Sequence, residues 1–179
     1  MGTDHAKRFF VAHLARGPKN AEGLASIVEG FLRLPARVEQ MALGWLDLPR
    51  DQRTELGGAS RLRGLLGQDT VIGERVRDVQ SRFRIVMGPM ELDRFRDFLP
   101  GQPSLERLRD WVRNYVGFEF DWDVQLVLAR DEVPGILLGG EGQLGWTTWL
   151  GARRAATDAD DLTLAPERTR PRSTTLTAA

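Results

Sequence analysis

The feature that most constrains the fold is the stretch 118–128, where every second residue is apolar. Successive side chains of a β-strand point to opposite faces, so this pattern predicts a strand with one face in the core. Burying the six aromatic and aliphatic side chains of that face is worth on the order of 10 kcal/mol before chain entropy is subtracted. The expected inward residues are Phe118, Phe120, Trp122, Val124, Leu126 and Leu128. The expected outward residues are Glu119, Asp121, Asp123 and Gln125.

Two amphipathic helices are predicted, over residues 20–32 and 104–116. In each, apolar residues recur at the spacing that forms one buried stripe on a helix. Asn20 and Ser104 are the expected N-caps, and Gly117 is the expected end of the second helix. Shorter helices are predicted over residues 7–15 and around Leu92, Phe95, Phe98 and Leu99.

Several short strands accompany these helices, which predicts an α+β fold with small antiparallel sheets. A turn is expected at Gly88-Pro89, because these two residues interrupt regular structure. The remaining predicted strands cover residues 37–46, 75–79, 82–87, 136–138 and 157–164.

The two halves of the chain share an order of elements that predicts an internal duplication. Residues 66–73 align without a gap on residues 144–151, and a Leu-Gly pair stands at each end of both segments. In both halves a helix, a strand and a Leu-Gly-Gly sequence precede the segment. We therefore expect two pseudo-repeated helix–strand–hairpin units, which usually pack about a pseudo-twofold and present two similar loops to two copies of a partner.

The boundaries follow from these units. Residues 1–18 form an N-terminal lead-in with a short helix, and residues 19–103 form the first unit with its connecting strands and helix. Residues 104–164 form the second unit. Residues 165–179 contain few apolar side chains and are expected to be a disordered tail.

Composition excludes several classes of function. The 25 basic and 25 acidic residues cancel, so no overall field attracts nucleic acid or an anionic membrane. The absence of cysteine excludes disulfides and thiolate sites, and no apolar run approaches the roughly twenty residues of a membrane span. The only histidines, His5 and His13, belong to no catalytic triad. We expect a cytoplasmic protein without catalytic residues, cofactor or bound metal.

Residues 140–145 match the dinucleotide-binding pattern G-x-G-x-x-G, and Asp160 follows at a suitable distance. That pattern binds pyrophosphate only where a helix begins directly after it. The following residues 146–151 are rich in β-forming side chains and end in glycine, so a β-rich turn is the better interpretation. Trp146 and Trp149 are then core residues or interface anchors.

Two acidic groups complete the candidate chemistry. Asp121 and Asp123 lie on one face of the predicted strand, with Cα atoms about 6.6 Å apart. This spacing of two carboxylates is the basis of the alternative hypothesis, a small ligand-binding or carbohydrate-active enzyme. The outward face of an amphipathic strand is the better interpretation, given the opposing apolar face. Residues 158–161 resemble the start of a calcium loop but lack its glycine and its bidentate glutamate.

Several segments in this order and spacing resemble the TssG family (ImpH or VasB) of the bacterial type VI secretion baseplate. They are residues 72–90, 98–101, 115–123, 132–134 and 144–151, and the resemblance extends from about residue 8 to about residue 164. TssG proteins are usually much longer, and this chain is similar to their C-terminal part.

The resemblance implies a structural, non-enzymatic protein. It implies a wedge subunit that joins two copies of TssF, holds TssK trimers and contacts TssE, at the inner face of the bacterial inner membrane. We further expect the loops 57–67 and 139–145 to be the paired contacts for TssK. The predicted partner-binding residues are Gly57, Leu62, Leu66, Gly67, Gly139, Leu144, Gly145, Trp146 and Trp149.

Overall fold

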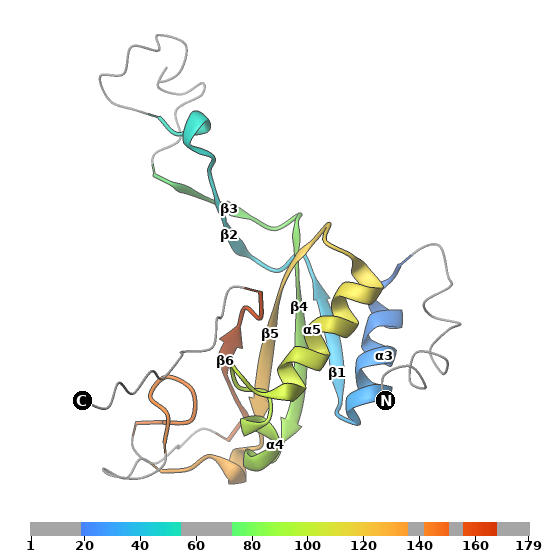
Figure 1. Cartoon of the computed structure of the whole chain (residues 1–179). Coiled ribbons are helices and arrows are strands. Elements are labelled where there is room, and N and C mark those ends of the chain that lie inside the picture. The colour runs from blue at the N-terminus through green and yellow to red at the C-terminus, as the bar shows by residue number, and fades with distance from the viewer. Residues whose placement is uncertain (1–18, 55–72, 136–141, 151–155, 168–179) are drawn as a thin grey trace, which may run out of the picture.

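The computed structural model describes residues 19–54, 73–135, 142–150 and 156–167, and these form an α+β fold, as expected (Figure 1). Two amphipathic helices, α3 (Ala21–Leu32) and α5 (Pro103–Val116), pack on one face of a four-stranded sheet. The short helix α4 (Leu92–Arg96) closes one end. No described helix is long and apolar enough to cross a membrane.

The central sheet has the order β1-β4-β5-β6. Its outer strands, β1 (Ala36–Gln40) and β6 (Ala159–Leu164), run antiparallel to their neighbours. The inner strands, β4 (Arg82–Met90) and β5 (Asp121–Leu128), pair in parallel. This parallel pair joins the two halves of the sequence into one sheet.

The core lies between that sheet and the helices. Ile85, Met87, Val124, Leu126 and Leu128 come from the inner strands and are fully buried. The helices contribute the stripes that their sequence spacing predicts: Leu24, Ile27, Val28 and Leu32 from α3, and Leu105, Leu108, Trp111, Val112 and Tyr115 from α5.

The N-terminus of α3 is fixed against the C-terminal turn of α5. The predicted cap is confirmed, because the Asn20 side chain accepts a hydrogen bond from Gly23 N at 2.9 Å. The Asn20 backbone N–H in turn donates to the Tyr115 hydroxyl at 3.2 Å. Near the C-terminus of α3, the rings of Phe31 and Trp111 of α5 pack with centroids 5.1 Å apart.

Each half repeats one order: a helix, a strand, an excursion and a returning antiparallel strand. The first excursion leaves β1 and returns in β4, and it contains β2 (Gly44–Asp47) and β3 (Arg75–Asp78). The second leaves β5 and returns in β6. Because β1 ends beside the start of β4, whereas β5 ends beside the end of β4, the excursions leave opposite ends of the sheet.

Two strand predictions were wrong in their extent. Residues 37–46 form not one strand but β1 and β2, which belong to different sheets, since the backbone turns at Met41 with a φ of 57°. The turn predicted at Gly88-Pro89 is also wrong, because β4 continues to Met90. The register with β5 shifts between Met87 and Met90, so a proline without an N–H is tolerated there.

The beginnings of α5 and β5 differ from expectation as well. The N-cap of α5 is Gln102 rather than Ser104, because Pro103 occupies the first helical position, where its missing N–H costs nothing. Strand β5 begins at Asp121, so Phe118 and Phe120 do not join the core and are 85% and 38% exposed.

Candidate protein-protein interface

The first candidate surface is the arm, which we define as β2 and β3 together with η1 (Arg50–Gln52). The two strands pair antiparallel from Gly44 with Asp78 to Asp47 with Arg75, and the arm extends away from the central sheet (Figure 1). A lone two-stranded sheet is at best marginally stable in water. The arm is therefore suited to being covered by a partner.

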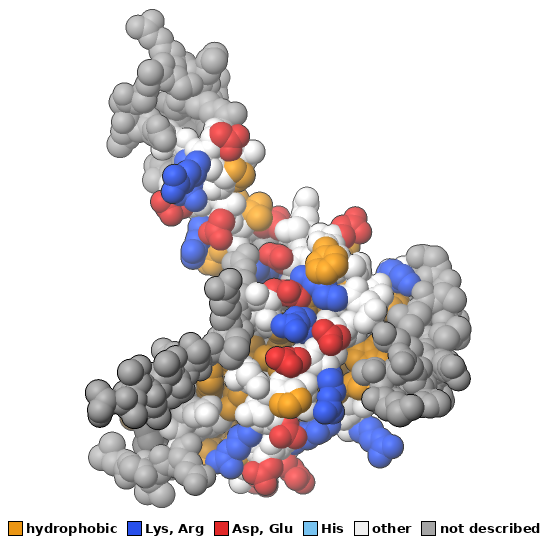
Figure 2. Space-filling model, in the orientation of Figure 1, with side chains coloured by type: hydrophobic (Ala, Val, Ile, Leu, Met, Phe, Trp, Pro, Cys, Tyr) orange, Lys and Arg blue, Asp and Glu red, His pale blue; other side chains and the backbone are white. Residues whose placement is uncertain are grey.

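The arm exposes apolar side chains on both of its faces. Trp45 is 54% exposed and Leu46 is 45% exposed. They are consecutive in β2 and so point to opposite faces. Leu43, just before the strand, is 52% exposed. Figure 2 shows apolar side chains among charged ones along the arm. Exposed apolar groups gathered on a projecting element are typical of a protein-binding surface.

Ion pairs stabilise the arm and leave its apolar side chains exposed. Arg75 bonds to Asp47 across the two strands at 2.6 Å. Arg53 pairs with Glu74 at 3.0 Å, and the Arg77 guanidinium lies 5.6 Å from the centre of the Trp45 ring. The predicted contact residues Gly57, Leu62, Leu66 and Gly67 stand in the sequence between the two strands of the arm and lie outside the described residues.

The second candidate surface is the segment 142–150 in the other excursion. It contains a turn at residues 144–146, with Gly145 at a φ of 81°, and Trp149 forms an isolated parallel bridge with Gly135. The side chains of Leu144 and Leu150 are 91% and 96% exposed. The predicted contact residue Gly139 lies outside the described residues.

The two tryptophans of this segment are mainly packing residues. Trp146 and Trp149 are partly buried against the core, and the Trp149 ring lies 6.2 Å from that of Phe95. Its indole N–H donates to Asp161 at 3.0 Å. The leucines rather than the tryptophans therefore form the exposed apolar surface of the segment. The helix that a dinucleotide-binding loop requires does not begin within residues 142–150.

The carboxylates Asp121 and Asp123 lie on one face of β5, as the alternation predicts, but Asp123 is buried rather than exposed to solvent. Its residue is only 4% exposed. Strand β4 places arginines opposite both carboxylates: Arg84 donates to Asp123 at 2.5 and 3.1 Å, and Arg82 lies 3.5 Å from Asp121. The expectation was wrong for Asp123 because the sequence does not show which strand pairs with β5.

This arrangement disfavours the carbohydrate-active alternative. The hydrogen bond with Asp123 raises the pKa of Arg84, so this guanidinium stays protonated. A catalytic carboxyl must be able to reach its substrate. Both oxygens of Asp123 instead accept hydrogen bonds from Arg84, and the residue is only 4% exposed. Among the described residues, no three histidine, aspartate or glutamate side chains gather as a metal site would require.

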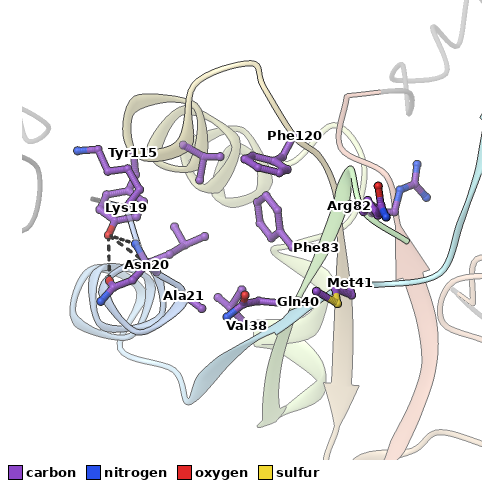
Figure 3. Close-up of a pocket in the computed structure, with 13 residues that line it drawn as sticks. Lys19, Asn20, Ala21, Val38, Gln40, Met41, Arg82, Phe83, Tyr115 and Phe120 are labelled. Carbon is purple, nitrogen blue, oxygen red and sulfur yellow. Dashed lines mark hydrogen bonds between the residues drawn. The ribbon is translucent and has the colours of Figure 1, made fainter. Parts of the chain in front are cut away.

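A cavity that the sequence did not predict lies between α3, α5 and one end of the sheet (Figure 3). Its volume is about 240 Å³, and its lining is mainly apolar, including Leu24, Val38, Phe83, Val116 and Phe120. The Asn20–Tyr115 hydrogen bonds lie at its edge. Lys19, Arg82 and Tyr115 are the charged or ionisable residues of its lining.

Comparison with known proteins identifies the family of the chain. The family model described as type VI secretion, TssG, matches residues 2–151. No curated protein matches the sequence.

Two solved structures have a similar fold. One is a chain of a cryo-electron-microscopy structure of the type VI secretion system TssK-TssF-TssG baseplate subcomplex, with a TM-score of 0.57 and 22% identity over 84% of this chain and 62% of that one. The other is a chain of a baseplate complex from the type VI secretion system, with a TM-score of 0.50 and 22% identity over 87% and 45%. This chain thus spans less than two thirds of either. Because the family model covers most of the sequence, the chain belongs to the TssG family of type VI secretion proteins.

Proposed function

We propose that this protein is a structural subunit of a type VI secretion baseplate and that it holds TssK adaptors through its two excursions while joining copies of TssF. The observation that carries the proposal is the pair of exposed apolar elements at opposite ends of one sheet. Membership of the TssG family and the similarity to chains of baseplate complexes support it. Its place of action would be the cytoplasmic face of the inner membrane.

In this proposal the arm and the segment 142–150 each contact one TssK trimer. The arm contributes Trp45 and Leu46, and the second segment contributes Leu144 and Leu150. The loops 57–67 and 139–145 would extend these contacts. Because the two elements lie at opposite ends of one sheet, each can hold its own trimer independently of the other. A catalytic role is not part of the proposal.

The first experiment measures co-purification of TssK with variants of each element. A Trp45→Ala, Leu46→Ala double variant removes the apolar faces of the arm, and Leu144→Ala, Leu150→Ala does the same for the other segment. Phe118→Ala is the matched control, because Phe118 is 85% exposed and lies on neither element. We expect each double variant to retain about half of the TssK and the combined variant to retain almost none.

Unchanged TssK recovery in the combined variant, or after shortening both loops 57–67 and 139–145, would contradict the proposed role of the excursions. Equal losses in the Phe118 control would show that general surface apolarity rather than these elements governs binding.

The contact with TssF is tested separately. We expect co-expression of the chain with TssF to give a complex whose native mass corresponds to two TssF copies, with TssE joining without displacing them. A complex with TssK alone under conditions where TssF is soluble would contradict the joining role.

A further inference from the structure

We propose that Arg82 is a positioning residue that sets the direction of the arm relative to the central sheet. The residue stands at the first position of β4, where the chain has just returned from the arm. For its effect on partner binding, this inference rests on the proposed function of the arm. Its structural content is independent of that function.

The arm is joined to the sheet by two short crossings that meet at Arg82. On the outgoing crossing, Ala42 N donates to Arg82 O at 3.0 Å. On the returning crossing, Asp78 accepts hydrogen bonds from the backbone N–H and the hydroxyl of Ser81, directly before Arg82. Ser81 O in turn accepts from Asp121 N at 2.9 Å. The backbone at the base of the arm is thus tied to β5 through residues 81 and 82.

The side chain of Arg82 also packs directly against the first strand of the arm. Gly44 opens β2 and is buried. A Cβ placed on Gly44 would lie 2.8 Å from both Cδ and Nε of Arg82. This is closer than van der Waals contact permits, so a side chain at position 44 requires either Arg82 or β2 to move. Its backbone conformation is one that alanine adopts readily, because no positive φ is recorded at Gly44.

Arg82 cannot move aside freely, because carboxylates hold its other side. Its guanidinium lies 3.5 Å from Asp121 and 3.8 Å from Asp123, and its side chain is only 15% exposed. Asp123 is itself held by two hydrogen bonds from Arg84. The arginine is therefore a spacer between the arm and the acidic residues of β5, and its position fixes how closely β2 approaches the sheet.

Two consequences follow for the arm. A larger residue at Gly44 must either push β2 away from the sheet or displace Arg82 from its ion pairs. Loss of the Arg82 side chain removes the spacer, so the arm samples a wider range of directions. Because the arm and the segment 142–150 leave opposite ends of the sheet, a change in direction at this joint alters the distance between the two proposed TssK contacts.

The test is a distance measurement between spin labels on the full chain. The protein has no cysteine, so Arg50→Cys on the arm and Asn114→Cys on α5 provide two unique and exposed labelling positions. Double electron–electron resonance is recorded for this labelled chain and for Gly44→Ala, Arg82→Ala and the Gly44→Ala, Arg82→Ala double variant. Arg37→Ala is the matched control, because Arg37 is an exposed arginine on β1 that pairs only with Glu39 among the described residues.

We expect a narrow distance distribution for the parent and the control, a shifted one for Gly44→Ala and a broadened one for Arg82→Ala. The double variant should match Arg82→Ala, because the three atoms nearest to a Cβ at position 44 all belong to the arginine. This non-additivity is the signature of a direct contact. Distributions that are unchanged in both single variants, or shifts that simply add in the double variant, would overturn the proposal.

Folding and function are separated by two further measurements. Thermal unfolding identifies any variant with a damaged sheet. If Arg82→Ala is damaged, Arg82→Lys shortens the spacer while keeping the charge, and the same broadening is expected. TssK co-purification is measured in parallel. An altered distance distribution with normal TssK binding would support the positioning role of Arg82 and contradict the proposed binding role of the arm. An unaltered distribution with lost TssK binding would contradict only the positioning role of Arg82.

Discussion

The buried carboxylate on β5 allows a sharp comparison between two aspartates on the same face of one strand. Asp123→Ala removes the acceptor of two charge-assisted hydrogen bonds from Arg84, and with it the negative charge that lies 3.8 Å from Arg82. The side chain of Asp123 is 5% exposed, whereas that of Asp121, which pairs with Arg82 at 3.5 Å, is 49% exposed. The two variants therefore delete the same carboxylate group, Asp123→Ala from a buried position and Asp121→Ala from a solvent-exposed one.

The magnitudes follow from this difference in burial. Removing one member of a fully buried ion pair costs roughly 3–5 kcal/mol, because the partner charge is left without compensation. The Arg84 side chain is 26% exposed and can partly hydrate, so we expect a loss of about 2 kcal/mol for Asp123→Ala. For Asp121→Ala the expected loss is about 0.5 kcal/mol, since exposed pairs contribute little.

Urea denaturation followed by tryptophan fluorescence measures both losses, and thermal unfolding provides a second estimate. A loss of about 2 kcal/mol corresponds to a decrease in Tm of roughly 4–8 °C in a chain of this size. Equal losses in the two variants would refute the reasoning, because they would show that burial of the carboxylate does not determine its contribution. A stabilised Asp123→Ala protein would show that desolvation of the pair outweighs its hydrogen bonds.

Three further variants test other contacts. Tyr115→Phe removes the hydroxyl that meets Asn20, and we expect a loss of about 1 kcal/mol in urea denaturation; no loss would show that the hydroxyl is equally well satisfied by water. Ser81→Ala removes the hydrogen bond that is the largest cause of the lowered pKa of Asp78. Because the folded-state pKa of Asp78 is lowered, its carboxylate stabilises the fold at pH values above the unfolded-state pKa. That stabilisation is lost as the pH falls through the folded-state pKa. The urea midpoints of wild type and Ser81→Ala should therefore differ at pH 7 and converge below the ordinary carboxyl range, whereas a constant difference would contradict the linkage. Leu126→Ala creates a cavity at a fully buried position and should cost about 2–5 kcal/mol, with a loss under 1 kcal/mol contradicting the packing described for the core.

Local patterns in the sequence were sufficient to predict the helices. Their buried stripes repeat at the helical spacing, and both the Asn20 cap and the Gly117 stop act within a single turn. The alternation around β5 correctly predicted Trp122 and the apolar residues after it. It failed for Phe118 because two aromatic residues in a connection after a helix have the same spacing as two residues in a strand.

The failures concern pairing between distant segments. The parallel contact of β4 with β5 places Arg84 against Asp123, and no local pattern specifies that partner. No local pattern predicts the arm either. The arm forms because the backbone turns at Met41 and the following strand, β2, pairs with β3 about thirty residues later. Of the predicted partner-binding residues, the structure describes Leu144, Gly145, Trp146 and Trp149, and among these Leu144 is the most exposed large side chain.

The parallel pairing of β4 with β5 has a mechanical consequence. The arm is attached where β4 begins, and the second excursion is attached where β5 ends. A pull that separates the two excursions therefore draws β4 and β5 past each other along their length. In this shear geometry all the hydrogen bonds between the two strands carry the load together, whereas a pull on two strands from the same end would open them one at a time. The β4–β5 pairing, which joins the two halves of the chain, is therefore oriented to resist tension between molecules bound to the two excursions.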